Sequence, residues 1–174
     1  SDYASRENTS AFMMFTSAVA VYMNRIKMNA ERFYIGTAVL NRSTVKEKNT
    51  AGMFVNTAPI LVELDNSQSF AENRNAIEVS AFSVLRHQKF NYGDVLASIR
   101  KEYGFSDKLF DVMLSYQNAT VTGTSIETTW YSCGMQTESL QMHIDDRDGE
   151  GIFRIHYDYL TDRFTEEDIF SLHS

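Results

Sequence analysis

The chain has 174 residues, of which 43% are hydrophobic and 13% are aromatic, so it can bury a core and is not intrinsically disordered. This length suits one compact domain or one lobe of a larger domain. The formal net charge of −7 at pH 7 and the sequence pI of about 5.1 argue against a nucleic-acid partner. Cys133 is the only cysteine, which excludes an intramolecular disulfide, and we expect a packing role for it.

The most apolar stretch, Ala11–Met23, is shorter than the ~20 residues that a helix needs to cross a bilayer. No charged region with a cleavage site precedes it, so we expect no signal peptide. We therefore expect a soluble, cytoplasmic chain without a membrane partner. The sequence has no repeat and no proline-rich linker, which predicts a single unit over residues 1–174, with residues 1–9 as a flexible or truncated lead-in.

The first part of the chain predicts a buried helix and two extended segments. Thr9 or Ser10 can cap a helix that runs to about residue 27, and apolar residues surround most of its circumference. A strand is predicted at residues 33–40, followed by a polar loop. A second extended segment covers residues 53–64, in which Pro59 indicates an edge strand or a bulge.

Two more helices are predicted in the middle of the chain. Ser69 and Glu72 have the pattern of a capping box, in which each side chain accepts from the backbone N–H of the other residue. We expect this helix to end near Arg86. Its predicted buried residues are Phe70, Ile77, Ala81, Val84 and Leu85. A shorter helix is predicted from Tyr92 to about residue 102, and Gly104 ends it.

The remainder of the chain is mostly strand. Apolar and polar residues alternate at 110–117, at 140–144 and at 153–157, which is typical of strands. Thr165, followed three residues later by Asp168, starts a terminal helix. Helices that lead and strands that follow around one mixed sheet predict the α+β class, here a mixed α/β sandwich with helices flanking the sheet.

The last two strands are predicted to form a hairpin. Asp148-Gly149 suits the two central positions of a type I′ turn, and in that register Ile144 faces Phe153. The apolar residues then share one side of the sheet, and the histidines of the two strands lie on the other side. A longer loop over residues 145–151 is the alternative.

Four blocks of sequence carry further information: IGTAVLNR with GMFVNTAP at residues 35–42 and 52–59, HQKFNY at 87–92, LFDVMLSYQN at 109–118 and YDYLTDRF at 157–164. In this order they resemble the condensation domains of nonribosomal peptide synthetases. The corresponding family patterns are IGTPVxxR…GMFVNTxPxR, HQxxPF, PLFDVMFxxQN and the closing segment YdtdLF. The resemblance covers roughly residues 10–174.

The resemblance implies the C-terminal lobe of a condensation domain, which consists of two chloramphenicol-acetyltransferase-like lobes. Such a domain joins a donor acyl thioester to an acceptor amine, each tethered by phosphopantetheine to a carrier domain. The implied partners are the N-terminal lobe of the same domain, the peptidyl carrier domains and an adjacent adenylation domain. The resemblance implies no cofactor bound directly by this chain, because the carriers bring the phosphopantetheine.

The catalytic signature of this family, HHxxxDG, belongs to the N-terminal lobe and does not occur in these 174 residues. The four histidines, none of which are adjacent, are His87, His143, His156 and His173. HIDDRDG at residues 143–149 lacks the doubled histidine. We therefore expect no catalytic or metal-binding residue in this chain, and no activity of the chain alone. A lobe without its partner exposes an apolar surface, so we also expect self-association.

The blocks supply candidate residues that the resemblance places along the substrate tunnel or at the lobe interface. These are Arg42, Asn56, Tyr116, Gln117 and Asn118. For Arg42 and Asn56 an alternative stays open, because polar side chains inside apolar blocks also satisfy buried backbone groups. His87 is predicted to cap the end of its helix, and Trp130 to pack in the core.

Two other functions stay open beside amide formation. One is the epimerisation or ester-forming branch of the same superfamily, and the other is a non-catalytic lobe that docks carrier or partner domains. Because branch-specific residues are concentrated in the N-terminal lobe, the sequence upstream of this chain would separate these alternatives.

Overall fold

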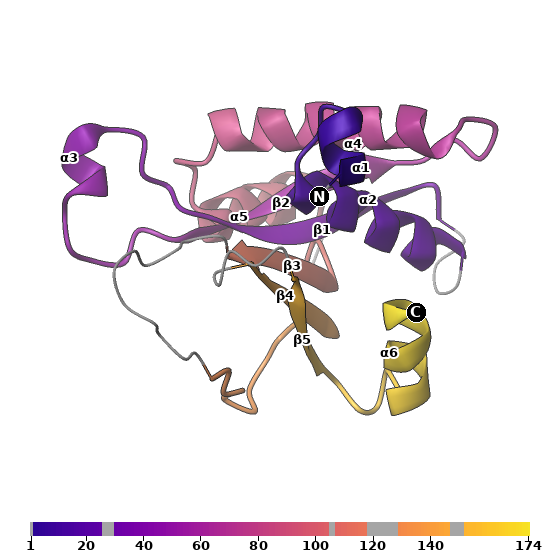
Figure 1. Ribbon diagram of the computed structural model, residues 1–174. Coiled ribbons are helices and arrows are strands. Elements are labelled where there is room, and N and C mark those ends of the chain that lie inside the picture. The colour runs from indigo at the N-terminus through magenta and orange to yellow at the C-terminus, as the bar shows by residue number, and fades with distance from the viewer. Residues whose placement is uncertain (1, 26–29, 105–106, 118–128, 147–151) are drawn as a thin grey trace.

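A mixed five-stranded sheet is the centre of this computed structural model, which describes residues 2–25, 30–104, 107–117, 129–146 and 152–174. The strands are β1 (Arg32–Val39), β2 (Asn56–Glu63), β3 (Val112–Gln117), β4 (Leu140–Asp145) and β5 (Arg154–Tyr159). The helices are α1 (Asp2–Arg6), α2 (Ala11–Met23), α3 (Val45–Lys48), α4 (Phe70–Arg86), α5 (Tyr92–Tyr103) and α6 (Glu166–His173) (Figure 1). No helix within these described ranges is both long enough and apolar enough to cross a membrane.

The strands lie in the order β2-β1-β3-β4-β5. The pairs β1–β2 and β4–β5 are antiparallel, whereas β1–β3 and β3–β4 are parallel. Pro59 therefore lies in an edge strand, β2, as predicted. The α+β class, with helices flanking one mixed sheet, is confirmed. The assignment of residues 1–174 to a single unit stays a prediction.

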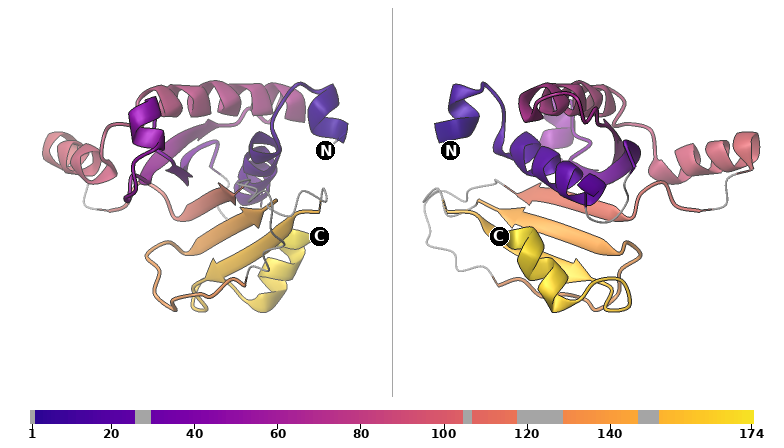
Figure 2. Two further views of the ribbon diagram at one scale, coloured as in Figure 1. Left: turned by 60° about the vertical axis from the view of Figure 1, so that its left-hand side comes forward. Right: turned by 90° about the vertical axis from the view of Figure 1, so that its right-hand side faces the viewer.

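One face of the sheet carries the hydrophobic core, with Ile35, Leu114 and Ile144 fully buried. Helices contribute Met13, Val19, Ala20 and Met23 from α2, Ile77 and Ala81 from α4, and Ile169 from α6. The Tyr22 hydroxyl donates to the Asp168 carbonyl at 3.3 Å, which ties α2 to α6. Figure 2 shows α6 beside the β4–β5 half of the sheet, whereas α4 runs along the β2 half.

The predicted helix starts are confirmed. The sequence could predict them because each start depends on a local side-chain contact. The Ser10 hydroxyl accepts from a backbone N–H of the first turn of α2 at 3.2 Å. Ser69 and Glu72 form the predicted capping box of α4, and Thr165 begins α6 with the same motif. Gly104 ends α5 at φ 66°, a left-handed conformation that costs a glycine little because it has no Cβ.

Two side chains that we expected α4 to bury are exposed. Phe70 is 36% exposed and Leu85 is 45% exposed, whereas Ile77 and Ala81 are buried as predicted. The helix packs on β2 and α2 through a narrow stripe. Leu85 lies about 100° around the helix from Val84, which is half-buried on that stripe. Phe70 opens the helix, where the stripe ends.

Residues 2–6, which we expected within a flexible or truncated lead-in, form α1. The chain after α1 contacts α4 through two side chains. The Glu7 carboxylate lies 3.5 Å from the guanidinium of Arg74, whose side chain is 4% exposed. The Thr9 hydroxyl donates to the Glu78 carboxylate at 3.4 Å. Because a buried charge that loses its partner is costly, the Glu7 contact ties this segment to the core.

The predicted register of the last two strands is wrong by two residues. Ile144 lies opposite Ile155 instead of Phe153. The faces are as predicted, because a shift of two residues keeps every side chain on its own side of the sheet. Residues 146–153 join the paired strands, a longer connection than a two-residue turn. The turn that we placed at Asp148-Gly149 lies outside the described residues.

Gly36 is expected to tolerate no side chain. A Cβ added there would overlap the ring of Phe110, which is buried and packs on the Tyr92 ring at a centroid distance of 5.2 Å. Gly36→Ala is therefore expected to lower the free energy of unfolding by about 1–3 kcal/mol through overpacking, as measured by urea denaturation. The additional change Phe110→Leu should recover part of the loss. An undiminished Gly36→Ala protein would contradict the overlap.

Candidate functional site

The connection between β1 and β2 is an arm that extends from the sheet, here called the α3 arm and defined as residues 40–55 (Figure 1). We expected a polar loop there, and the structure adds α3, which opens with a capping box of Thr44 and Glu47. The pattern of a capping box is visible in the sequence at these two residues, so this helix was predictable. The apolar side chains that the arm exposes are Leu40 (73%), Val45 (76%), Met53 (92%) and Val55 (50%).

Arg42 closes the α3 arm on itself. Its guanidinium donates to the backbone carbonyl of Glu47, to that of Thr50 at 2.6 Å and to that of Gly52 at 2.8 Å. It also lies over the Phe54 ring, 4.1 Å from the ring centre, in a cation–π contact. Arg42 therefore satisfies backbone carbonyls of the arm itself, whereas the alternative that the sequence left open was a role with buried backbone groups in the floor of the sheet. Its place at a tunnel or lobe interface stays a prediction.

Asn56 joins two of the sequence blocks. Its side-chain amide donates to the carbonyl of Gln88 at 3.1 Å and to that of Phe90 at 2.6 Å. Its side-chain oxygen accepts from the Thr57 N–H at 3.0 Å. The first residue of β2 therefore holds the turn between α4 and α5, and Asn56 too has the backbone-binding role.

Lys89 connects this turn to the α3 arm, and the sequence did not single it out. Its ammonium donates to the Asn41 carbonyl at 3.0 Å and pairs with the Glu47 carboxylate at 2.7 Å. Glu47 also accepts from the backbone N–H groups of Ser43 and Thr44. The Lys89 contact, followed by these backbone contacts, holds the pKa of Glu47 well below its usual range. The base of the arm is thus fixed by charge-assisted hydrogen bonds.

Tyr116 and Gln117 lie at the carboxyl end of β3, which runs parallel to β1, so they lie at the same edge of the sheet as the α3 arm. The Tyr116 hydroxyl donates to the Asp146 carboxylate at 3.0 Å. Burial and this hydrogen bond raise the pKa of Tyr116 to about 12, so its hydroxyl stays protonated at neutral pH and acts as a hydrogen-bond donor. The Gln117 carbonyl accepts from the Asp146 N–H at 3.0 Å. Asn118 lies outside the described residues.

A second cluster lies on the face of β4 and β5 opposite the core. His143 and His156 are direct partners across these strands. Trp130 lies across both imidazoles, with ring centroids 4.2 Å from His143 and 5.6 Å from His156. Trp130 therefore does not pack in the core as we expected, but belongs to residues 129–138, here called the covering segment, which lie over the polar face. The alternation of apolar and polar residues in the two strands predicted that His143 and His156 share a face. No pattern in the sequence predicted that the Trp130 ring packs on these two imidazoles.

Polar atoms of this cluster are buried without partners. Within the described ranges, both ring nitrogens of His143 and Nε1 of Trp130 have no hydrogen-bond partner. Each such atom costs about 1–3 kcal/mol relative to a paired one. Burial lowers the pKa of His143; the Asp158 carboxylate, 3.5 Å from Nε2, opposes this shift and His156 adds to it. The balance favours a neutral His143 at neutral pH.

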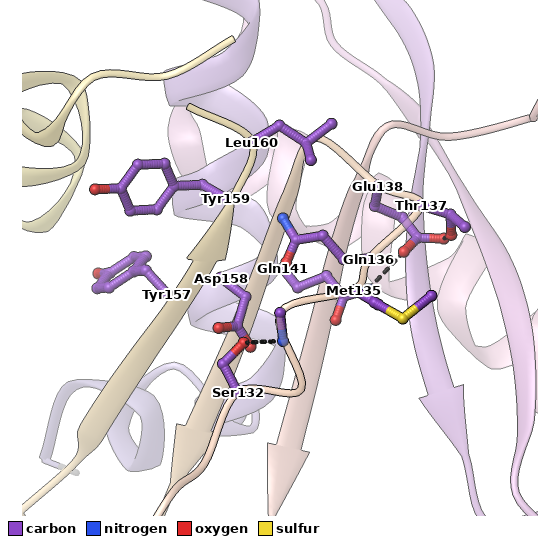
Figure 3. Close-up of a pocket in the computed structure, with 11 residues that line it drawn as sticks. Ser132, Met135, Gln136, Thr137, Glu138, Gln141, Tyr157, Asp158, Tyr159 and Leu160 are labelled. Atoms are coloured by element: carbon purple, nitrogen blue, oxygen red, sulfur yellow. Dashed lines mark hydrogen bonds between the residues drawn. The ribbon is translucent and has the colours of Figure 1, made fainter. Parts of the chain in front are cut away.

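The covering segment also forms a wall of a pocket with a volume of about 770 Å³ (Figure 3). The lining residues are Ser132, Gly134, Met135, Gln136, Thr137, Glu138, Gln141, Tyr157, Asp158, Tyr159 and Leu160. Figure 3 shows Asp158 and Gln141 on the side of the covering segment, whereas Tyr157 and Tyr159 point to the other side of β5. Where the structure describes the chain, no group of three His, Cys, Asp or Glu side chains is placed to hold a metal ion.

Two predictions for single residues have different outcomes. His87 caps the end of α4, as predicted, with its Nδ1 2.8 Å from the Ser83 carbonyl. The packing role expected for Cys133 is wrong, because this residue is exposed, and its thiol donates to the Met135 carbonyl at 3.1 Å. Cys133 lies in the covering segment, which runs over the sheet and adds nothing to the core.

Comparison with known proteins gives the following matches. A family model described as the condensation domain matches residues 1–174. Surfactin synthase subunit 1 of Bacillus subtilis (strain 168) is 30% identical over 170 residues, which are 96% of this chain and 5% of that protein. A plipastatin synthase of the same organism is 28% identical over 159 residues, which are 90% of this chain and 6% of that protein.

Solved structures share the fold. The condensation domain of the monacolin K polyketide synthase matches with a TM-score of 0.82 at 17% identity, covering 99% of this chain and 41% of that one. A four-domain nonribosomal peptide synthetase bound to AMP and glycine matches with a TM-score of 0.82 at 16% identity, covering 99% of this chain and 14% of that one. The chain thus spans a small part of its curated relatives and less than half of either solved chain.

Asn56→Ala is expected to lower the free energy of unfolding by about 1–3 kcal/mol, since it removes two hydrogen bonds to the turn between α4 and α5. Urea denaturation measures the loss, and amide hydrogen exchange should become faster at residues 88–92. Phe90→Ala is the matched control, because it keeps the backbone carbonyl that Asn56 binds and its side chain is 66% exposed. An equal loss of stability in both variants would contradict the backbone-binding role.

Proposed function

This chain belongs to the condensation-domain family, and we propose that it is the C-terminal, acceptor-side lobe of a nonribosomal peptide synthetase condensation domain. Coverage supports a part of such a domain, because 99% of the chain matches only 41% of a condensation-domain chain at a TM-score of 0.82, and the order of the sequence blocks carries the C-terminal assignment. The catalytic pattern HHxxxDG, which the family places in the other lobe, is absent from the sequence. In this proposal the chain is part of an enzyme and carries no catalytic base.

In the proposed reaction, an acceptor amine attacks the carbonyl carbon of a donor thioester. The new C–N bond replaces the C–S bond, the thiolate leaves on the phosphopantetheine of the donor carrier, and the amine loses a proton. The base for that proton lies in the N-terminal lobe, and this chain contributes surface and positioning. The proposed partners are that lobe, the peptidyl carrier domains and the adenylation domain. The match to part of a four-domain synthetase supports partners of this kind.

The α3 arm is the surface that we place against the rest of the domain. Val45 and Met53 are 76% and 92% exposed, and with Leu40 and Val55 they place four exposed apolar side chains on one connection, a grouping that marks contact surfaces. Arg42 and the Lys89–Glu47 pair brace the arm from inside, so its shape does not depend on a partner. A rigid arm with an apolar surface suits a contact between lobes.

The chain alone is expected to form no amide bond, because it lacks the histidine base. The test mixes the purified chain with carrier-bound donor and acceptor thioesters and follows the product by mass spectrometry. A longer protein that includes an HHxxxDG lobe is the positive control. Turnover by the chain alone would refute the proposal, and an upstream sequence without HHxxxDG would favour the non-catalytic docking lobe.

Self-association through the α3 arm is a second expectation. The double change Val45→Ser and Met53→Ser removes exposed apolar area and should shift the chain towards monomer in analytical ultracentrifugation. Val79→Ser is the matched control, because Val79 is 71% exposed but lies on α4. A chain that is monomeric at every concentration, or an equal shift in the control, would count against the arm as the contact surface.

A further inference from the structure

The face of β4 and β5 opposite the core carries a cluster that the proposed function does not use. Its members, here called the clamp, are Trp130, His143, His156 and Asp158. We propose that the clamp is a proton-sensitive switch, which holds the start of the covering segment on the sheet while both imidazoles are neutral and releases it when both are protonated.

The clamp brings the start of the covering segment into contact with the sheet. The Trp130 ring lies nearly parallel to that of His156, at an interplanar angle of 22°, and at 34° to that of His143. The end of the segment is held separately, since the Glu138 carboxylate accepts from the Gln141 amide and the Ser139 hydroxyl donates to the Asp111 carboxylate at 2.7 Å. Loss of the ring contacts would therefore free the start of the segment and leave its end in place.

The closed clamp accommodates a proton on each imidazole less easily than a proton on one of them. Burial disfavours a charge on His143, and the Asp158 carboxylate, 3.5 Å from Nε2, offsets only part of that cost. A second imidazolium, on His156, would be the direct cross-strand partner of His143, and like charges at such positions repel. The clamp holds one carboxylate for two imidazoles, so the second proton favours separation.

Few other charges face the clamp. On the neighbouring strand β3, Ser115 is the partner of His143 and carries no charge. Two positions further along the β4–β5 ladder, Asp145 lies opposite Arg154. The titratable residues of the covering segment are Tyr131 and Cys133, which are exposed, and Glu138, which binds Gln141. The charged groups on this face are therefore the two imidazoles and Asp158 of the clamp, together with the neighbouring Asp145 and Arg154.

The closed clamp also leaves hydrogen-bonding capacity unused. Among the described residues, Nδ1 and Nε2 of His143 and Nε1 of Trp130 lack hydrogen-bond partners. An imidazolium has two N–H donors and needs two acceptors. Water supplies them once the segment moves away, whereas the closed clamp offers only the Asp158 carboxylate. Release would also open the pocket, because Ser132 and Gln136 of the same segment line its wall.

The direction of the switch follows from the sign of the shift at His143. Burial lowers its pKa below the ordinary value of 6.5, so the folded, closed state prefers the neutral ring. The clamp is then fully closed above pH 6.5, and closure is lost as the pH falls through the lowered pKa. The midpoint of opening is therefore expected below pH 6.5.

Trp130 is the only tryptophan of the chain, so its fluorescence reports on the clamp directly. The 174-residue chain is titrated between pH 8 and pH 5, where histidine changes charge. We expect the emission maximum to shift to the red and acrylamide quenching to increase, while far-UV circular dichroism stays constant. Quenching of the emission without a red shift would overturn the proposal, because protonation would then leave the segment in place.

Matched substitutions identify the groups responsible. His143→Gln and His156→Gln each remove one of the two charges and should abolish the transition or move it to lower pH. His87→Gln, at the end of α4, should leave it unchanged. A transition that survives in both clamp variants, or that coincides with loss of circular dichroism, would overturn the proposal. Should a variant fail to fold, NMR titration of the imidazole protons in the unsubstituted chain decides, since an unperturbed pKa for His143 would equally overturn it.

Discussion

One short segment of parallel pairing, between β1 and β3, joins the two halves of the sheet in this protein. β1 meets β3 at Gly36 with Met113 and at Thr37 with Leu114, and the buried Thr37 hydroxyl adds a hydrogen bond to the Leu114 carbonyl at 2.9 Å. On one side of this junction lies the β1–β2 hairpin with α4, and on the other lie β4, β5 and α6. Because the junction is short, the absence of a side chain at Gly36, which lets Phe110 lie close to the backbone, matters for the whole sheet.

Elements that depend on local chemistry were predictable from the sequence. Ser69 and Glu72 satisfy each other's backbone groups within one turn, so the start of α4 needs no tertiary contact. Strand faces followed from alternation in the same way. The pairing of Ile144 was not predictable, because alternation fixes only the parity of a register, and the connection after β4 decides among registers of equal parity.

The sequence predicted the candidate site only in part, because the partners of its side chains are not visible in a sequence pattern. The family resemblance drew attention to Arg42 and Asn56, but their partners are backbone carbonyls, which every residue carries and no sequence pattern reveals. Lys89 binds a carbonyl as well as a carboxylate. The contact of Trp130 with His143 depends on the path of the chain between β3 and β4, and periodicity contains no information about that path.

The hydrogen bonds from Asn56 to backbone carbonyls also determine which positions can vary among related sequences. Gln88 and Phe90 offer Asn56 only their carbonyl oxygens, and the Phe90 side chain is 66% exposed. Neutral substitution should therefore be frequent at Phe90, because almost any residue presents the same acceptor there, whereas the Gln88 side-chain amide also donates to the Leu85 carbonyl at 3.0 Å. Asn56 has no such freedom, since a replacement must supply two donors at the same place. Variation should thus be tolerated at Phe90 and not at Asn56.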